Sequence, residues 1–548
     1  MIVTAGWRSC DRGGHGHARR CGVCLGFEHT RTGPVHPGFG ADVHRRITAP
    51  GALAAASLLL AIPASAASHA PGAPGIGDPY YPAYGNGGYD VSHYDLRLKY
   101  QPATDRLEGT ATLLARTTQD LSTFNLDFLL DVSEVRVNGA LAKFRATGEH
   151  ELEITPKTPL DKGTAVTVVV RYSGVPSQKE AYGFTSWHRT PDGGVAANEP
   201  EAAWWWFPAN DHPLDKATYD VSVLVPDGTQ AISNGTLQST SSRLGWTRWN
   251  WRSNKPQATY LATLAVGRFD LTTGKTESGI PVVNAYSKDL GDHYGAARAS
   301  IERTGEIADW LTGYFGPYPY NALGGYVPNT DTGYALETQT RPFYSPRQFA
   351  NGTNTSLVVH ELAHQWYGDL VSVRQWKDIW INEGFARYAQ WLWSEHEGEG
   401  TAQEIADHVY ASRPADDPFW TVEPGDPGPD NQFHVAVYDR GALALQALRN
   451  EIGDADFFTL LKGWPQRHAH GNASVADFRR YAEEVSGKPL AALFDTWLYQ
   501  PSKPGATAAR DASITPRTAK AVAQPKSWKK IAATNGAHEH GRGHGHED

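Results

Sequence analysis

Two histidines and a glutamate lie at a spacing that can hold a metal ion. His360, Glu361 and His364 form the pattern H-E-x-x-H inside a run from Leu357 to Trp366 whose apolar positions recur at helical spacing. On a helix, residues four positions apart share a face, so both imidazoles can point at one cation, and zinc accepts histidine nitrogen without strain. Glu361 falls on the flank of that face, where it can reach a water molecule on the metal and act as a general base.

A catalytic zinc ion needs a third protein ligand and one open position. A second segment contains Glu383, with 18 residues between it and His364. That length is enough to end one helix, turn, and return on a second helix beside the first, and Gly368 and Asp369 are suitable stop residues. H-E-x-x-H alone is a short pattern that also occurs without a metal. The two segments together predict one zinc ion per chain, held by His360, His364 and Glu383.

These segments resemble the zinc aminopeptidases typified by aminopeptidase N, a gluzincin family in which H-E-x-x-H is followed, after eighteen residues, by the glutamate of an N-E-G-F-A segment. Here that segment spans residues 382–386, and further similarity runs from about Tyr89 to about Gln500. The resemblance implies an α+β multidomain fold: an N-terminal antiparallel β-sandwich or saddle-like sheet, then a thermolysin-like mixed α/β zinc-peptidase domain. It also implies a short form without the large helical C-terminal domain of many relatives, and hence a more open cleft.

The resemblance assigns roles to three further residues. Tyr438 corresponds to the tyrosine that polarises the scissile carbonyl in relatives, and a phenol can donate a hydrogen bond to a developing oxyanion at neutral pH. Glu337, in a segment similar to the family's G-A-M-E-N strand, and Glu199, in the loop before F-P-x-x-D, correspond to residues that bind the substrate's free amine. Each also has a structural alternative: a tyrosine packed at a helix start, an edge-strand glutamate and a surface carboxylate.

The sequence departs from the family pattern near both glutamates. Tyr334, Leu336 and Thr338 replace Gly, Met and Asn of the G-A-M-E-N strand. Ala209 stands where relatives often have Cys, and Trp205 where many have Arg. Trp205 is the centre of three consecutive tryptophans, which either line an apolar wall of the cleft or pack in the core. The side-chain preference at the cleaved end therefore stays open.

Length and composition indicate a chain of several domains that can bury large hydrophobic cores. The 548 residues are 40% hydrophobic and 20% charged, with a formal net charge of −9, which predicts two to four domains and argues against a nucleic-acid-binding protein. Residues 88–275 are predicted to be a β domain, because polar and apolar residues alternate around Tyr94 and Asn138-Gly139 is a hairpin turn signal. Residues 276–501 are predicted to be the thermolysin-like catalytic domain.

Residues 1–66 are predicted to be a signal segment with an N-terminal extension. Arg45-Arg46 precede an apolar run ending near Ile62, and Ala64-Ser65-Ala66 follows, which is the pattern of a secretory signal cleaved after Ala66. We therefore expect a secreted protein without stable membrane insertion, the alternative being an uncleaved anchor. Met1 is interpreted as an over-extended start, with translation beginning nearer the apolar run.

The remaining segments are assigned by composition. All three cysteines lie in the extension, so the mature chain is expected to contain no disulfide. Residues 67–87 are assigned as a linker. Residues 502–548 are assigned as a disordered, His-rich tail, because Pro, Ala, Lys and Thr dominate and no apolar periodicity remains. The histidines at its end either bind divalent metal loosely or are merely solvated.

Taken together, these residues predict a secreted zinc metallo-aminopeptidase that removes N-terminal residues from peptides. Glu361 would take a proton from the attacking water and deliver it to the leaving amine, while Tyr438 stabilises the oxyanion. Two alternatives stay open: an endopeptidase, oligopeptidase or other zinc hydrolase on the same fold, and a non-catalytic secreted protein that binds metal or peptide. The second is disfavoured because binding requires neither Glu361 nor Tyr438.

Overall fold

The computed structural model describes residues 68–505 and 522–535. The predicted signal segment, all three cysteines and the histidines at the chain's end lie outside these ranges. None of the helices in the described ranges combines the length and apolar character that a bilayer crossing requires.

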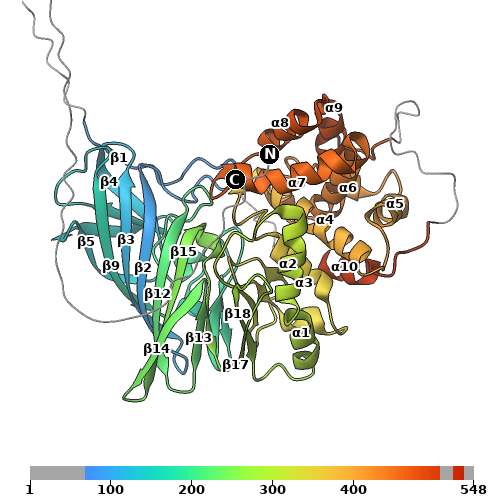
Figure 1. Ribbon diagram of the computed structural model, residues 1–548. Coiled ribbons are helices and arrows are strands. Elements are labelled where there is room, and N and C mark those ends of the chain that lie inside the picture. The colour runs from blue at the N-terminus through green and yellow to red at the C-terminus, as the bar shows by residue number, and fades with distance from the viewer. Residues whose placement is uncertain (1–67, 506–521, 536–548) are drawn as a thin grey trace, which may run out of the picture. The chain divides into compact units, whose positions relative to one another are not determined.

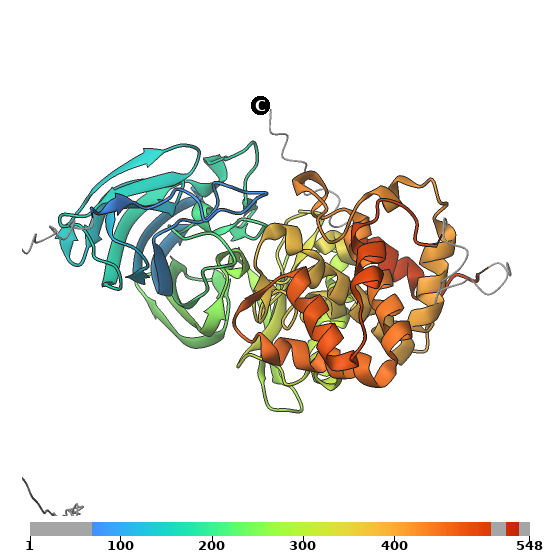
Figure 2. The same ribbon diagram turned by 90° about the horizontal axis from the view of Figure 1, so that it is seen from above.

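An eight-stranded sheet forms most of the N-terminal β region (Figure 1). Seen from above, its blue and teal strands curve strongly (Figure 2). Polar and apolar side chains alternate along β2, so that one face of the strand is buried and the other is solvated. In sheet order, the strands are β14 (Thr236–Arg243), β15 (Trp246–Gln257), β12 (Ala217–Pro226), β2 (Tyr89–Gln101), β3 (Arg106–Thr117), β9 (Ala165–Gly174), β5 (Asp131–Val137) and β6 (Ala140–Leu141).

Two four-stranded sheets complete the β region. The first contains β1 (Ala70–Pro71), β4 (Leu121–Asp127), β8 (Glu151–Thr155) and β7 (Lys143–Thr147); the second contains β10 (Trp187–Thr190), β11 (Gly193–Ala196), β16 (Leu264–Gly267) and β13 (Gln230–Ser233). The expected N-terminal β-sheet domain is confirmed. It is not purely antiparallel, because β12 pairs with β2 in parallel and β1 pairs with β4 in parallel. Parallel partners need long connections, which leave no local sequence signal.

The predicted hairpin turn at Asn138-Gly139 is present. These two residues connect β5 to β6, with φ values of 51° and 80°. Both values lie in the left-handed region that a two-residue type I′ turn requires, and Asn and Gly are the residues that adopt it most readily. The Asn138 side chain also accepts a hydrogen bond from the backbone N–H of Thr167, 2.9 Å away, on the neighbouring strand β9.

A five-stranded mixed sheet opens the catalytic region. Its strands, in order, are β17 (Phe269–Lys275), β18 (Pro281–Ser287), β19 (Leu323–Val327), β21 (Phe343–Tyr344) and β20 (Ala335–Leu336). β17 was expected to close the N-terminal β domain, but it pairs along its length with β18. The change of sheet therefore precedes residue 269 rather than following residue 275. A further pair, β22 (Ser372–Val373) and β23 (Asn472–Ala473), is parallel.

Ten α-helices lie within the described residues, and all of them follow the β region. They are α1 (His293–Ile301), α2 (Thr304–Phe315), α3 (Thr355–Ala363), α4 (Trp380–His396), α5 (Ala402–Ser412), α6 (Val435–Ile452), α7 (Asp454–Arg467), α8 (Val475–Ser486), α9 (Ala491–Phe494) and α10 (Trp528–Asn535). α3, most of α4 and most of α6 are buried, as expected for central helices of a large core.

Two segments assigned as linker and tail are packed. In the first, Tyr80 and Tyr81 are buried, and the Tyr81 hydroxyl donates to Oε1 of Gln432 at 2.6 Å. In the second, residues 522–535 contain α10, whose Ile531 is fully buried. Both assignments rested on composition, which gives no weight to a few well-placed aromatic or aliphatic side chains. The rest of the predicted tail beyond residue 505 lies outside the described residues.

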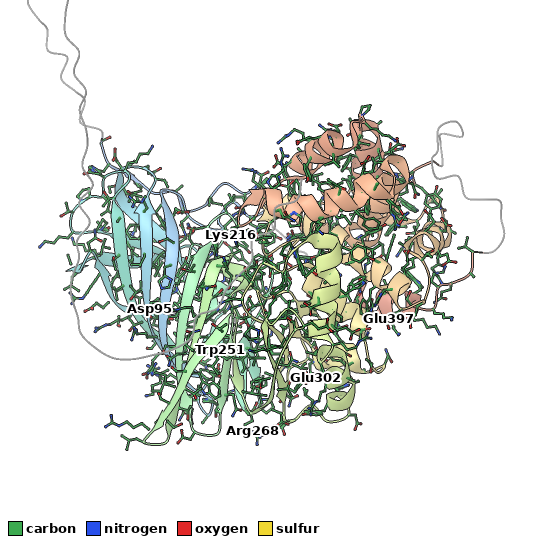
Figure 3. All side chains as sticks on the ribbon, in the orientation of Figure 1. Asp95, Lys216, Trp251, Arg268, Glu302 and Glu397 are labelled. Carbon is green, nitrogen blue, oxygen red and sulfur yellow. The ribbon has the colours of Figure 1, made fainter. Side chains whose placement is uncertain are left out.

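Lys216 joins the β region to the catalytic region. It directly precedes β12 (Figure 3), and its half-buried side chain donates three hydrogen bonds. The acceptors are the carbonyl oxygens of Asp369, Leu370 and Gly471, at 3.0, 3.2 and 3.0 Å from Nζ. An ammonium has three protons to donate, so this arrangement satisfies all of them.

We predict that Lys216→Met lowers the free energy of unfolding by about 1–3 kcal/mol, because three carbonyl oxygens lose their donor. Chemical denaturation followed by tryptophan fluorescence measures the change. Lys179→Met is the matched control, since Lys179 forms only an exposed pair with Asp131. It should cost under about 0.5 kcal/mol. Equal effects of the two substitutions would show that the Lys216 contacts contribute nothing specific.

Candidate active site

Helix α3 presents both histidines to one point. Its N-cap is Asn354, whose side chain accepts a hydrogen bond from Leu357 N at 3.2 Å. His360 lies within the helix and His364 is its C-cap residue, still in the right-handed helical conformation. The chain turns immediately afterwards, and Gly368 adopts a φ of 134° there, which favours glycine. The predicted helix therefore ends slightly earlier than its predicted stop residues.

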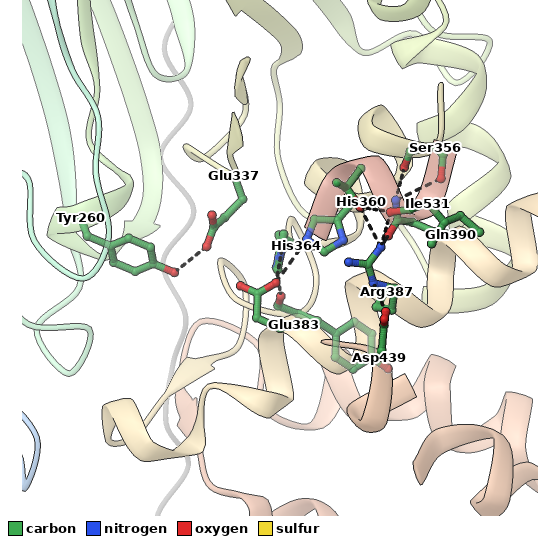
Figure 4. A network of polar contacts seen from close by, with 12 residues as sticks. Tyr260, Glu337, Ser356, His360, His364, Glu383, Arg387, Gln390, Asp439 and Ile531 are labelled. Atoms are coloured by element: carbon green, nitrogen blue, oxygen red, sulfur yellow. Dashed lines mark hydrogen bonds and ion pairs between the residues drawn. The ribbon is translucent and has the colours of Figure 1, made fainter. Parts of the chain in front are cut away.

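Glu383 meets the two histidines from the first turn of α4. Its Oε2 atom is 3.2 Å from His360 Nε2 and 3.5 Å from His364 Nε2 (Figure 4). One ligand atom from each of the three residues lies within 4.8 Å of the others, and all three side chains are buried. These are the separations expected of ligands that share one cation with metal–ligand distances near 2 Å.

The donor set suits zinc. His364 Nδ1 lies 3.0 Å from the carbonyl oxygen of Tyr367, which accepts its proton and leaves Nε2 directed at Glu383. Burial lowers the pKa of His360 to about 3, which keeps its imidazole in the neutral form that binds metal. Burial alone would lower the pKa of His364 as well, but the carboxylates of Glu383 and Glu337 raise it above its usual value. The raised pKa of His364 means that the surrounding carboxylates favour positive charge at this position.

Excess negative charge surrounds the triad. Besides Glu383, the buried carboxyl groups of Glu337 and Glu361 and the half-buried one of Glu199 face the same region, and burial raises the pKa of each. Oε1 of Glu361 is buried without a hydrogen-bond partner among the described residues. A dication would lower these pKa values and supply the missing counter-charge. The residues therefore fit a bound divalent metal on charge as well as on geometry.

Glu361 and Glu337 are brought together beside the metal ligands. One oxygen of each and one His364 nitrogen lie within 4.8 Å of one another. Glu337 directly follows strand β20, and its Oε1 accepts a hydrogen bond from the Tyr260 hydroxyl at 3.1 Å. Glu199 is half-buried, and after burial the nearby charges of Glu337 and Glu383 contribute most to raising its pKa.

Tyr438 reaches the site because two helices approach each other closely. Its ring is stacked on that of His360, with centroids 5.9 Å apart and planes 26° apart. It lies in the first turn of α6, which packs against α4. A Cβ atom at Gly441 would be 2.5 Å from the Trp380 ring and 3.2 Å from the Cα of Gly384. Glycine at position 441 therefore permits the contact that places Tyr438 next to Glu383.

The three consecutive tryptophans are core residues. Trp204, Trp205 and Trp206 are all fully buried, and Trp205 Nε1 donates to the carbonyl oxygen of Lys179 at 3.1 Å. Of the two alternatives that the sequence left open, core packing is the one observed. Sequence reasoning also missed Tyr260, Arg387 and Asp439, all of them buried. The only local signal was the position of Arg387, one helical turn after Glu383.

A second buried group of potential ligands lies in the β region. Asp127, His150 and Glu151 bring ligand atoms within 4.8 Å of one another. His150 Nε2, however, is 3.1 Å from the carbonyl oxygen of Ala83, and this contact occupies the nitrogen nearest the carboxylates. At the site formed by His360, His364 and Glu383, the two Nε2 atoms instead face Oε2 of Glu383, at 3.2 and 3.5 Å.

The fold and the buried triad define a metal site of the H-E-x-x-H type with a downstream glutamate ligand. Comparison with known proteins agrees: the family model described as the Peptidase family M1 domain matches residues 343–497, and that of the Peptidase M1 N-terminal domain matches residues 91–261. The chain belongs to peptidase family M1. The resemblance to the aminopeptidase N-type family is thereby confirmed.

Relatives with curated descriptions include glutamyl aminopeptidases. That of Bos taurus is 30% identical over 329 residues, covering 56% of this chain and 34% of the relative. That of Sus scrofa is 27% identical over 455 residues, covering 75% of this chain and 47% of the relative. The chain thus spans between a third and a half of the length of these relatives.

One of the similar solved structures is matched by this chain over almost its entire length. The M1 zinc metallopeptidase of Deinococcus radiodurans superimposes with a TM-score of 0.70 at 28% identity, covering 78% of this chain and 99% of that one. A variant of that protein has been solved bound to a Tyr-Ser-Ala substrate, with the same TM-score and coverage. The fold expected from the sequence, a β-sheet domain followed by a mixed α/β catalytic domain, is confirmed.

We predict that the purified chain carries about one zinc ion, measured by elemental analysis, and that Glu383→Ala removes it. The loss of affinity should exceed the 10- to 100-fold that is typical of losing an outer-shell partner of a metal ligand. Glu337→Gln is the control, because Glu337 lies beside the triad without belonging to it. Retention of full zinc by Glu383→Ala would show that this glutamate is not a ligand.

Proposed function

We propose that this chain hydrolyses the first peptide bond of peptides that have a free N-terminus. The proposal is supported by family membership and above all by one observation: the Glu337 and Glu361 carboxylates and the His364 imidazole converge within 4.8 Å. In an amino acid, a single carbon separates the α-amino group from the carbonyl carbon. A substrate anchored by its ammonium at Glu337 therefore presents its first carbonyl, and no later one, to Glu361.

Each residue then has a defined task. Zinc held by His360, His364 and Glu383 would supply a Lewis acid that polarises the substrate carbonyl and acidifies water. Glu361 accepts a proton from the water that attacks the carbonyl carbon, and it delivers that proton to the amine nitrogen as the C–N bond breaks. Tyr438 donates a hydrogen bond to the oxygen on which negative charge develops.

The substrate's ammonium has two acceptors. Glu337 and Glu199 are both carboxyl groups in a buried, carboxylate-rich region, and an ammonium brings a positive charge that lowers the cost of ionising them. Tyr260 donates to one oxygen of Glu337 and so orients the other oxygen for the substrate. A peptide whose amine is acetylated lacks this charge and also adds bulk where the carboxylates lie.

We predict that aminoacyl anilides and short peptides with a free amine are cleaved, and that their N-acetylated counterparts are cleaved at least about 100-fold more slowly, since burying unpaired carboxylates costs several kcal/mol. Release of aniline and mass spectrometry of the products measure both rates. Glu337→Gln should narrow the difference between free and acetylated substrates. Equal cleavage of the two by the wild type would favour the endopeptidase alternative.

Glu361→Gln tests the proposed proton transfer by Glu361. It should keep zinc and lose turnover by about 100-fold or more, 100-fold being the lower end of the usual contribution of general acid–base catalysis. If the wild type and Glu361→Gln both bind zinc and substrate, but neither hydrolyses any of the anilides or peptides, the chain is the non-catalytic binding protein.

We also propose that the chain is exported. Arg45-Arg46, the apolar run ending near Ile62 and Ala64-Ser65-Ala66 support this, as they form the three regions of a secretory signal. We predict that the protein collected from the culture medium begins at residue 67, and N-terminal sequencing tests this. An intact residue 1–66 segment on a cell-retained protein would contradict it.

A further inference from the structure

A buried arginine connects the metal site to a part of the chain that lies outside the range of the family models. Arg387 is fully buried on α4, one turn after Glu383. Its Nε atom is 3.2 Å from Oδ1 of Asp439, and its guanidinium carbon lies 5.6 Å from the centre of the Tyr438 ring. Asp439 directly follows Tyr438 on α6, so Arg387 holds the turn of helix that carries the tyrosine.

The other partners of Arg387 come largely from the C-terminal segment (Figure 4). Its Nη1 atom donates to the carbonyl oxygen of Ile531 at 3.0 Å and to the hydroxyl oxygen of Thr534 at 2.7 Å, as well as to Oε1 of Gln390 at 2.8 Å. Ile531 and Thr534 belong to α10 and are both fully buried. Of these two residues, Thr534 lies in the last turn of α10, the end of a helix that carries partial negative charge and favours a cation.

α10 is anchored to the end of α4 by separate contacts. The hydroxyl groups of Ser394 and Ser527 are 2.7 Å apart, and the Lys530 ammonium lies 2.9 Å from Oε1 of Glu399. The family model for the catalytic domain ends at residue 497, whereas α10 begins at Trp528. The segment is therefore a feature of this chain that the family match does not account for.

We propose that Arg387 is a positioning residue for Tyr438 and Glu383, and that Ile531 and Thr534 of α10 complete its environment and so act on the reaction without touching substrate. A guanidinium is planar and has five N–H groups in a fixed fork, so its acceptors determine where it lies. Asp439 fixes one side of the fork and α10 fixes the other. Loss of the α10 acceptors frees the guanidinium to shift, and with it Asp439, the Tyr438 ring and the adjacent carboxylate of Glu383.

The inference rests on the proposed peptidase function, and the test uses the full chain. Thr534→Val removes the hydroxyl acceptor at nearly constant volume. Ser527→Ala is the matched control, because it removes another buried hydroxyl of the same segment that contacts Ser394 and not Arg387. Steady-state hydrolysis of a free-amine aminoacyl anilide, zinc content and thermal unfolding are measured for each variant.

We expect Thr534→Val to lower kcat by roughly three- to tenfold with KM changed less than about twofold and zinc retained, because catalytic geometry is sensitive to small displacements. Ser527→Ala should leave kcat within about twofold, whatever it does to thermal stability. In an Arg387→Lys background the effect of Thr534→Val on kcat should disappear, since both substitutions act on one contact.

Other results would overturn the inference. A Thr534→Val variant with unchanged kcat, an equal loss of kcat in Ser527→Ala, or fully additive effects with Arg387→Lys would make α10 a purely structural element. If the wild type cleaves no anilide, the proposed function fails, and the visible absorption of the cobalt-substituted chain then decides. A spectrum altered by Thr534→Val and unaltered by Ser527→Ala would support the positioning role; two unaltered spectra would refute it.

Discussion

Buried negative charge is the constraint on which this site depends. Glu337, Glu361 and Glu383 are buried and the half-buried Glu199 lies near them, in a region where carboxylates interact strongly and water screens them little. Two imidazoles can compensate only part of that charge. A dication shared by His360, His364 and Glu383 compensates more of this negative charge. In the proposed function, a substrate ammonium at Glu337 would compensate a further part. The same charge that makes the region costly when empty therefore favours both metal and an amine-bearing ligand.

The carboxylates of this region repel one another, so the packing of the surrounding residues must fix their positions. The rings of Tyr367 and Phe385 stack at 4.3 Å between the segment after α3 and helix α4. Glycines at positions 384 and 441 bring α4 and α6 into close contact. Around this framework, Arg387 is paired with Asp439. The β region also takes part, because Tyr260 and Glu199 come from it.

The parts of the site that the sequence predicted are those set by local geometry. His360 and His364 lie four residues apart on a helix, and Glu361 follows from the same spacing. Glu383 was predicted because the metal needs a third ligand and the length of chain after His364 allows a second helix to return beside the first. Tyr438 was found through a segment similar to a family. Contacts between segments far apart in the chain could not be predicted, because no local pattern signals them. They include the Lys216 hydrogen bonds, the parallel pairing of β12 with β2, and the packing of α10 against Arg387. Composition even misdirected the assignment of α10, because one buried isoleucine among polar residues resembles a solvated tail.

A single side-chain amide explains how Glu337 keeps its place relative to the metal ligands. Gln365, next to His364, donates from Nε2 to the carbonyl oxygen of Glu337 at 3.1 Å and accepts from Thr340 N at 2.7 Å. Thr340 has a φ of 69°, a conformation that a β-branched residue adopts only when its surroundings impose it. The Gln365 amide thus holds both ends of the turn after Glu337 against the end of α3. His364 and Gln365 are adjacent in the chain, and the Gln365 side chain binds the backbone of Glu337. The distance between His364 and Glu337 is therefore fixed by one peptide unit and one side chain. That fixed distance is what would limit cleavage to one residue at a time.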